Sequence, residues 1–477
     1  MITITRSLAK ELKTILRRAF PQTRHSPPAV EFVQSDTSLT IRAQHAGSAV
    51  QYQHEQVGTP GTCVVPFAVL DDCEGTRREP VTLTAQAEGK LLVEWSDKGI
   101  PQLVTYDQLC PAKQPFPALP NSLATNPPEL LSALATAVEL TDPDSARYAL
   151  GCLQLAGSQG RLAATDGRQA LMQAGFQFGF AEDLLLPATK LFSATGLQGQ
   201  PVEVGRTEEH LVFRIGRWTF WLAIRQEGRF PHVEDVFPRA QDATTEVHLA
   251  PADARFLAEH VGRLPADGNG GDAVTVDLNG AVAIRSAASE NATELVLTNS
   301  HRTGSEVRIV SSRQYLERAA KLGFTQWYVS SPDKPVLCQD GTRSYVWMLH
   351  HADNKEAVPA HVVQVASPLA PAKAAASSKP ARLARPTIGS PTSSRISTVM
   401  PTCRKRQPQA PANDTSVKSA ENDSLTSPME QALALRSELR NLASRANSLV
   451  RSLQQQRRQE RLLRSTLASL KQLQAAG

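Results

Sequence analysis

Few residues in this sequence are placed to carry out catalysis or to bind a metal. His350-His351 is an adjacent histidine pair, but neighbouring residues of a strand point to opposite faces, which disfavours a metal site. Gly268-Asn269-Gly270-Gly271 lacks the lysine and the following helix of a phosphate-binding loop. There is no His-Glu-x-x-His or Gly-x-Ser-x-Gly motif, and Asp71-Asp72 is expected to be a solvated pair near a helix end. The sequence argues against an enzyme and predicts neither a cofactor nor a metal.

Cysteine usage and hydropathy indicate a cytoplasmic protein. No Cys-x-x-Cys pair occurs, so neither a zinc site nor a disulfide framework is predicted, and a reducing compartment fits best. No apolar run is long enough to span a bilayer, and the start of the chain has no signal-peptide pattern. The six cysteines are Cys63, Cys73, Cys110, Cys152, Cys338 and Cys403.

Charge divides the 477 residues into two parts. Residues 357–477 hold 18 Lys and Arg against 6 Asp and Glu, a net charge of +12. The remaining residues hold 33 against 40, a net charge of −7, so the chain carries +5 in all. A basic tail on an acidic body often marks contact with nucleic acid.

The tail itself falls into two segments. Residues 357–427 are rich in Pro, Ala and Ser with almost no aromatic residue, so we expect a disordered basic linker. Residues 428–475 carry leucines in alternating four- and three-residue spacing, from Leu435 to Leu470. That spacing predicts a coiled coil or, equally, one amphipathic helix that docks on the body.

The body contains a loose threefold repeat. Each third opens with an amphipathic helix, continues through alternating strands and contains a second, shorter helix. Phe116 and Phe230 lie in similar Pro-rich signals 114 residues apart. The pattern predicts an α+β fold of antiparallel sheets in three units, 1–120, 121–243 and 244–351. The expected helices are Ser7–Phe20, Pro127–Leu140 and Pro251–Leu264, followed by Phe67–Cys73, Pro187–Thr195 and Ser312–Leu322.

Turn residues predict individual hairpins. Strands at Val30–Val33 and Leu39–Ala43 flank a turn-rich gap. Asp166-Gly167 and Asn279-Gly280 are hairpin-turn pairs, so Arg161–Thr165 should pair with Gln169–Gln173.

Several motifs in this frame resemble those of the bacterial DNA polymerase III beta sliding clamp family. The motifs occur in the family's order over roughly residues 1–350. They are Arg147-Tyr148-Ala149-Leu150, Ala164-Thr165-Asp166-Gly167-Arg168-Gln169, Gly228-Arg229-Phe230-Pro231, Ser331-Pro332-Asp333-Lys334-Pro335-Val336 and Tyr345-Val346-Trp347-Met348.

The resemblance implies three clamp domains per chain, with sheets outside and helices inside. Two chains would close head-to-tail into a homodimeric ring around double-stranded DNA. The implied partners are the catalytic subunit of the replicative DNA polymerase and the clamp loader, and no membrane is involved. The ring would act as a processivity factor, which agrees with the lack of catalytic motifs.

Basic residues on the expected helices are candidates for DNA contact. At 100° per residue, Lys10, Lys13 and Arg17 fall opposite the apolar face of the first helix. Basic side chains attract phosphates without reading bases. Glu74 stands where clamps often carry a basic residue. The resemblance adds Arg24, in the loop after the first helix, and Arg147 and Tyr148 also lie outside the expected helices. The full set predicted to contact DNA is Lys10, Lys13, Arg17, Arg24, Arg147, Tyr148, Lys190, Arg255, Arg313, Arg318 and Lys321.

The resemblance also implies a pocket for partner peptides between the second and third units. Arg168, Gln169 and Ala170 replace the family's usual His-Arg-Leu, which bears on partner choice. Strand positions would equally allow some of these residues to be plain core. The predicted pocket residues are Leu150, Thr165, Gly167, Arg168, Gln169, Ala170, Pro231, Val236, Val346 and Met348.

Two other functions remain open at this point. A divergent clamp-like scaffold would use the coiled coil to assemble partners on DNA, and the basic tail and altered pocket favour it. An unrelated transferase or hydrolase lacks any supporting motif. The segment Gln431–Leu435 also loosely resembles the peptides that clamp partners present, so the tail could compete for its own pocket.

Overall fold

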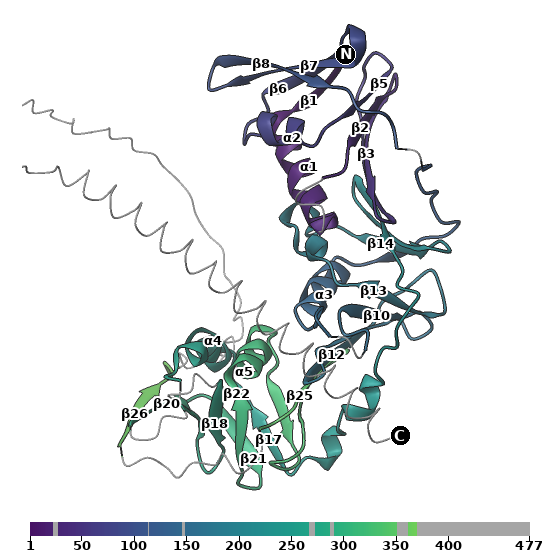
Figure 1. Ribbon diagram of the computed structural model, residues 1–477. Helices are drawn as coiled ribbons and strands as arrows, with labels where there is room; N and C mark the ends of the chain where they lie inside the picture. Colours follow the sequence, from purple (N-terminus) through teal and green to yellow (C-terminus); the bar gives the residue numbers. More distant parts are fainter. Residues whose placement is uncertain are drawn as a thin grey trace, which may run out of the picture. The chain divides into compact units, whose positions relative to one another are not determined.

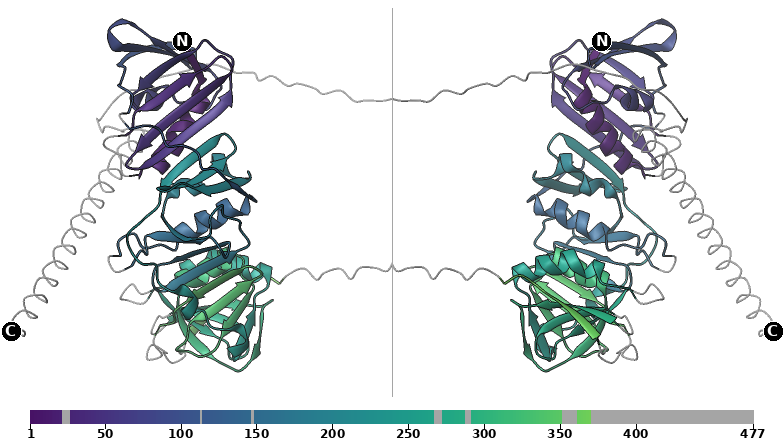
Figure 2. Two further views of the ribbon diagram at one scale, coloured as in Figure 1. Left: turned by 90° about the vertical axis from the view of Figure 1, so that its right-hand side faces the viewer. Right: turned by 90° about the vertical axis from the view of Figure 1, so that its left-hand side faces the viewer.

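A computed structural model describes residues 1–21, 27–112, 114–145, 148–266, 272–286, 291–350 and 361–369. They belong to one compact unit, Met1–Ser378. The predicted helix at 428–475 and the segment Gln431–Leu435 lie outside the described residues. The fold is α+β with many strands and few helices, as the sequence predicts (Figures 1 and 2). Among the described residues, no helix is long and apolar enough to cross a membrane.

The first run of elements follows the predicted order of helix, strands, short helix and strands. A 3₁₀ turn, η2 (Ala87–Gly89), lies between two of its later strands. The helices and strands are β1 (Ile2–Thr5), α1 (Arg6–Ala19), β2 (Val30–Gln34), β3 (Ser38–His45), β4 (Ser48–Glu55), β5 (Gly61–Val65), α2 (Ala68–Cys73), β6 (Pro80–Ala85), β7 (Lys90–Asp97) and β8 (Ile100–Asp107).

The second run repeats this order with one difference. The second helix, expected at Pro187–Thr195, is instead two 3₁₀ turns, because Ala194 adopts an extended backbone between them. The elements are β9 (Ala124–Asn126), α3 (Glu129–Val138), β10 (Cys152–Ala156), β11 (Arg161–Thr165), β12 (Gln169–Ala174), β13 (Asp183–Pro187), η3 (Lys190–Ser193), η4 (Thr195–Leu197), β14 (Val202–Arg206), β15 (His210–Ile215) and β16 (Trp218–Ala223).

The third run follows two 3₁₀ turns, η5 (Val233–Val236) and η6 (Ala240–Asp242). Its helices again agree with the predicted ones to within a few residues. The elements are β17 (Thr245–His248), α4 (Pro251–His260), η7 (Val261–Arg263), β18 (Ala273–Asp277), β19 (Val282–Ser286), β20 (Asn291–Leu297), β21 (His301–Gly304), β22 (Arg308–Ser312), α5 (Arg313–Lys321), β23 (Gln326–Val329), β24 (Val336–Asp340) and β25 (Arg343–Trp347).

One further strand, β26 (His361–Ala366), lies within the segment that composition predicts to be a disordered linker. The prediction is wrong for these six residues. Three of them are valines, which favour strands, and the edge of β20 supplies backbone partners. A composition average over the whole 357–427 segment conceals this short run.

Strand pairing joins the successive runs into continuous sheets. The sheet β5-β2-β3-β4 continues through an antiparallel β4–β16 pair into β16-β15-β14-β9. The sheet β13-β10-β11-β12 continues through an antiparallel β12–β25 pair into β25-β24-β23-β17-β21. The two remaining sheets are β1-β6-β7-β8 and β22-β18-β19-β20-β26. Both junctions therefore use the same arrangement of edge strands.

Helix α1 shows how local sequence builds these elements. The Thr5 hydroxyl accepts a hydrogen bond from the Leu8 amide at 3.2 Å and so caps the helix. Leu12, Ile15 and Leu16 are buried along one face, as their spacing predicts. The predicted hairpins are also present, since β2 pairs with β3, β11 with β12 and β18 with β19.

Arg6, the first residue of α1, is buried and holds the start of the helix in place. Its guanidinium donates to the Glu79 and Asp97 carboxylates at 3.0 and 2.9 Å. It also donates to the carbonyls of Cys73, Glu74 and Ser96. One side chain thus connects α1 to the end of α2 and to β7.

We expect Arg6→Ala to lower the free energy of unfolding by about 3 kcal/mol or more, because it leaves buried carbonyls and carboxylates without their donor. Arg17→Ala is the control. It also removes an ion pair, with Asp71 at 2.7 Å, but its side chain is 57% exposed and it should cost less than about 1 kcal/mol. Urea unfolding at pH 7 measures both. Equal losses would contradict this role for Arg6.

Candidate functional site

A cavity of about 150 Å³ lies where the β11–β12 hairpin, the end of β25 and η5 come together. Every predicted pocket residue except Leu150 lines it. The β12–β25 pairing brings these segments together and sets Ala170 opposite Val346. The lining residues are Thr165, Gly167, Arg168, Gln169, Ala170, Pro231, His232, Val233, Val236, Pro335, Val346, Trp347 and Met348.

The cavity combines a fixed floor with exposed apolar groups. Thr165, Ala170 and Val346 are buried, so the floor is part of the packed structure. Val236 is 48% exposed and Met348 is 46% exposed. Exposed apolar side chains beside a preformed hollow can bury an apolar ligand group.

Leu150 lies against the hairpin turn and does not line the cavity. It is buried, and a Cβ placed on Gly167 would stand 3.5 Å from its Cδ1. Gly167 has a φ of +88°, a left-handed conformation that favours glycine. The Asp166 carboxylate accepts from the Arg168 and Gln169 amides at 2.8 and 3.0 Å and fixes the same turn.

Gln169, in the cavity wall, forms side-chain hydrogen bonds with three neighbouring side chains. Its amide oxygen accepts from the Arg318 guanidinium and from the Tyr345 hydroxyl, both at 2.7 Å. Its amide nitrogen donates to Asp166 at 2.7 Å. Burial raises the pKa of the Tyr345 phenol well above its ordinary value, so the phenol stays a neutral donor. Gln169 therefore supports the wall through α5 and β25.

Four lining residues were not among those predicted: His232, Val233, Pro335 and Trp347. The motifs around Phe230 and Pro335 carried a signal for three of them. Trp347 lies within the motif Tyr345-Val346-Trp347-Met348, but successive strand residues point to opposite faces, so it was not expected on the same face as Val346. Its indole donates to the Ser311 hydroxyl at 3.0 Å. An ion pair between Arg161 and Glu234 also ties η5 to β11.

The predicted basic residues of α1 are largely paired with α2. Lys13 contacts Asp71 and Glu74, both at 2.9 Å, and Arg17 contacts Asp71. Burial acts to lower the pKa of Lys13, but hydrogen bonds to Glu74 and Asp71 outweigh it and the pKa is raised. Lys10 is exposed. The positive charge on this face is thus partly neutralised within the protein.

The other residues predicted to contact DNA occupy different environments. Arg313 is buried and donates to the Leu264 and Pro265 carbonyls, so the structure does not present it to a phosphate. Arg318 spans to Gln169 and to the Glu139 carbonyl, and Lys321 pairs with Glu317 at 2.6 Å. Lys190, Arg255 and Tyr148 are exposed. Arg24 and Arg147 lie outside the described residues.

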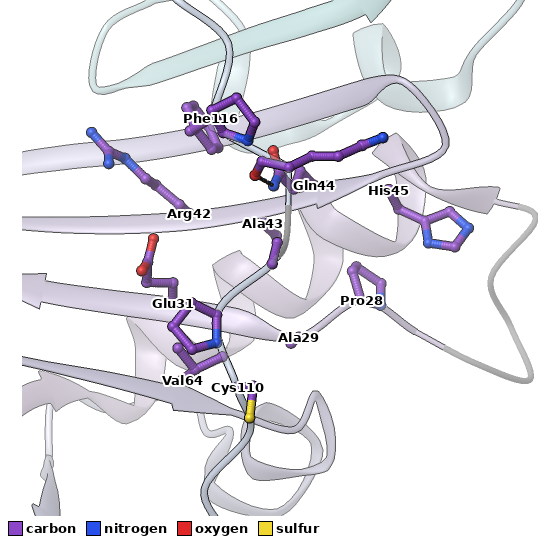
Figure 3. Close-up of a pocket in the computed structure, with 14 residues that line it drawn as sticks. Pro28, Ala29, Glu31, Arg42, Ala43, Gln44, His45, Val64, Cys110 and Phe116 are labelled. Atoms are coloured by element: carbon purple, nitrogen blue, oxygen red, sulfur yellow. Dashed lines mark hydrogen bonds between the residues drawn. The ribbon is translucent and has the colours of Figure 1, made fainter.

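A second cavity, of about 420 Å³, lies beside β3 (Figure 3). Cys110 lines it, and the Arg42 guanidinium stands 4.9 Å from the centroid of the Phe116 ring, also at this cavity. No group of three or more His, Cys, Asp or Glu within the described ranges is arranged to hold a metal ion. His351 of the histidine pair lies outside those ranges.

Comparison with solved structures identifies the fold. The DNA polymerase III beta subunit of Pseudomonas aeruginosa matches with a TM-score of 0.61 and 19% identity, over 73% of this chain and 99% of that one. The described part of the chain has the sliding-clamp fold. The Bacillus subtilis sliding clamp matches with a TM-score of 0.60 and 16% identity, over 73% of this chain and 98% of that one.

The Streptococcus pyogenes beta subunit matches with a TM-score of 0.61 and 14% identity, over 73% of this chain and 99% of that one. No protein-family model matches the chain, and no curated protein is significantly similar in sequence. The resemblance seen in the motifs is thus shown at the level of the fold.

Cys110 is exposed, whereas the other described cysteines are buried. We therefore expect Cys110 to react with a thiol reagent at pH 8 at least about 100-fold faster than they do. Burial raises the pKa of Cys63 to about 11 and that of Cys73 to about 12, and it also raises the pKa of Cys152 and Cys338. The test uses a Cys403→Ser chain, with Cys110→Ser added as the control. A second fast thiol in the native protein would contradict the burial of the four.

Proposed function

We propose that this chain is a DNA polymerase sliding clamp. Residues 1–120, 121–243 and 244–351 act as three clamp domains, and two chains close head-to-tail into a ring around double-stranded DNA. The single observation that carries the proposal is the repeated junction: β4–β16 and β12–β25 join successive units through equivalent edge strands. The fold match over 99% of a solved beta subunit supports it.

The same junction rule identifies the two edges that a second copy would join. Strand β20 follows β18 and β19 in its sheet as β4 follows β2 and β3 and as β12 follows β10 and β11, and β8 corresponds to β16 and β25. A third junction of this kind can form only between chains, from β20 of one to β8 of the other. Two copies then close the ring with two identical contacts.

DNA contact in this ring is weak and independent of sequence. The exposed Lys10, Lys190 and Arg255 supply phosphate-attracting charge, whereas Lys13 and Arg17 are partly neutralised by carboxylates. A closed ring does not require tight binding, because it is held by topology. The net positive charge of residues 357–427 adds further attraction for phosphates.

The cavity at the β12–β25 junction is the proposed docking site for partner peptides. Met348 and Val236 bury an apolar anchor, and the exposed Arg168 contacts the polar part of the peptide. The proposed partners are the replicative polymerase catalytic subunit and the clamp loader, in the cytoplasm. The chain itself is not an enzyme and takes no cofactor.

A clamp-like scaffold is the second candidate. The Arg168-Gln169-Ala170 sequence favours it, because Gln169 is committed to Arg318, Tyr345 and Asp166 within the protein. A pocket with this altered wall would select partners other than the polymerase, assembled through the 428–475 segment.

We expect the dimeric chain to remain on closed circular DNA through a high-salt wash and to leave linear DNA of the same sequence by sliding off its ends. High salt screens phosphate contacts but leaves a topological link intact. Gel filtration of the washed complexes measures retention. Linearising the circle after assembly is the matched control. Equal retention on both forms would contradict an encircling ring.

We expect Met348→Ala with Val236→Ala to weaken binding of a Gln-x-Leu-x-Phe peptide by about 10-fold, since two exposed apolar contacts are lost. Val57→Ala is the control, because Val57 is 89% exposed and does not line the cavity. Fluorescence anisotropy with a labelled peptide gives both affinities. An unchanged affinity in the double variant would place the peptide elsewhere.

A further inference from the structure

Strand β26 covers the outer edge of β20 (Figure 1). The pairing is parallel and runs from Asn291 opposite His361 to Val296 opposite Ala366. Both junctions within the chain are antiparallel, so β26 does not imitate them. It nevertheless occupies the backbone groups that a third junction would use.

The segment after β26 is fastened by side chains. The buried Ser367 donates to the Asp253 carboxylate at 2.6 Å, and its own hydroxyl accepts from the Thr298 amide at 2.9 Å. The Thr298 hydroxyl and the Asn299 side-chain amide donate to the carbonyls of Ser367 and Pro368, both at 2.9 Å. We call these contacts the Ser367 latch.

The Asp253 carboxylate accepts hydrogen bonds from other groups besides Ser367. The Asn299 amide, the Asn299 side chain and the Ser300 hydroxyl also donate to it, at 2.9, 2.7 and 2.6 Å. Burial acts to raise the pKa of Asp253, but hydrogen bonds from Ser300, Ser367 and Asn299 outweigh it and lower the pKa. The carboxylate thus keeps three donors when Ser367 leaves, so release of the segment does not strand a buried charge.

The outward side of β26 makes few contacts. Val363 is 63% exposed and Val365 is 38% exposed. Within the described part of the chain, the side-chain hydrogen bond of β26 runs from the Gln364 amide to Glu294 at 2.8 Å. A strand held mainly by backbone pairing and one latch can separate without opening the core of the third unit.

The corresponding edge at the other end of the chain is open. Strand β8 is the last strand of its sheet, and Ile100 and Leu103 on it are 64% and 62% exposed. A long edge strand with exposed apolar residues invites pairing with another chain. Thus one of the two ring-closing edges is unpaired within the described residues and the other is covered.

We propose that residues 361–369 are a built-in cap that holds the outer edge of β20 and must leave before β8 of a second copy can pair there. This proposal rests on the proposed ring, because the cap would regulate the closure of that ring. A covered β20 shifts the equilibrium between monomer and dimer toward the monomer. Release of the cap opens the edge and allows two copies to close.

The first test weakens the cap in the full chain by Val362→Pro with Val363→Pro. Alternate residues of a strand direct their N–H groups to a given neighbour, so two consecutive prolines remove at least one donor to β20. Ala375→Pro with Ala376→Pro is the matched control beyond the cap. Ser367→Ala removes the latch alone. Faster hydrogen exchange of the β20 amides verifies release.

Sedimentation equilibrium then gives the dimer dissociation constant. If the cap is in place nine-tenths of the time, each junction is about 10-fold harder to form, and a ring with two junctions about 100-fold harder. We therefore expect the Val362→Pro, Val363→Pro chain to dimerise about 100-fold more tightly than wild type. Ser367→Ala should fall between them, and the control pair should match wild type.

The second test fastens the cap with a disulfide. Thr293 and Val363 are register partners, and neighbouring strands lie about 4.8 Å apart, within the range of about 4.4–6.8 Å that a disulfide bridges. Thr293→Cys with Val363→Cys, in a Cys110→Ser, Cys403→Ser background, should stay monomeric when oxidised. Reduction should restore the wild-type equilibrium, and Val363→Cys alone is the control.

The possible outcomes distinguish failure of the cap proposal from failure of the ring proposal. Equal dimerisation of the wild-type, proline-pair and oxidised chains would overturn the cap and leave the ring standing. Failure of the proline pair to dimerise, or to stay on circular DNA, while its β20 amides exchange rapidly would overturn the ring itself. Tight dimerisation of the proline pair, together with a monomeric oxidised chain, would support both.

Discussion

The unpaired edge of a β-sheet is the constraint on which the rest of this structure depends. An edge strand presents backbone N–H and C=O groups that gain from pairing, and the chain repeats the same edge at β4, β12 and β20. Strand β16 satisfies the first and β25 the second. Strand β26, from beyond the repeated part, satisfies the third. The first two pairings determine which units are neighbours in the structure.

The candidate pocket is a consequence of the second junction. Pairing of β12 with β25 sets Ala170 beside Val346 and brings Gln169 within reach of Tyr345 and Arg318. No single unit holds all the walls, because η5 and the start of β24 complete them from two sides. If the cavity is the proposed docking site, a change that loosens the junction would alter partner binding without touching an exposed pocket residue.

The fold was largely predictable because its signals are local. Helical spacing in α1 and the turn residues Asp166-Gly167 act within a few positions of the chain, and the structure confirms both elements. Nine of the ten residues that the motifs predicted for a pocket line one cavity, and its use as a peptide pocket stays a proposal. Long-range partners could not be predicted: Lys13 meets Asp71 and Glu74 on another helix, and Arg313 turns inward to Leu264. A basic residue on a helix face carries no local sign of its distant partner.

Strand β26 is a further case in which a tertiary partner overrides what composition predicts. The stability of its pairing with β20 would determine how readily the proposed ring closes. Tethered to its own chain, β26 acts at an effective concentration in the millimolar range. A second copy at micromolar concentration must therefore offer more than one strand. In the proposed ring it would do so in two ways, since β8 is an eight-residue strand with exposed Ile100 and Leu103, and each ring would form two such contacts at once. Parallel pairing of β26 is also slightly weaker per residue than the antiparallel pairing of the internal junctions. Closure of the proposed ring would thus be a competition between the tethered strand β26 and strand β8 of a second copy, and chain concentration would set its balance together with the contacts that hold residues 361–369.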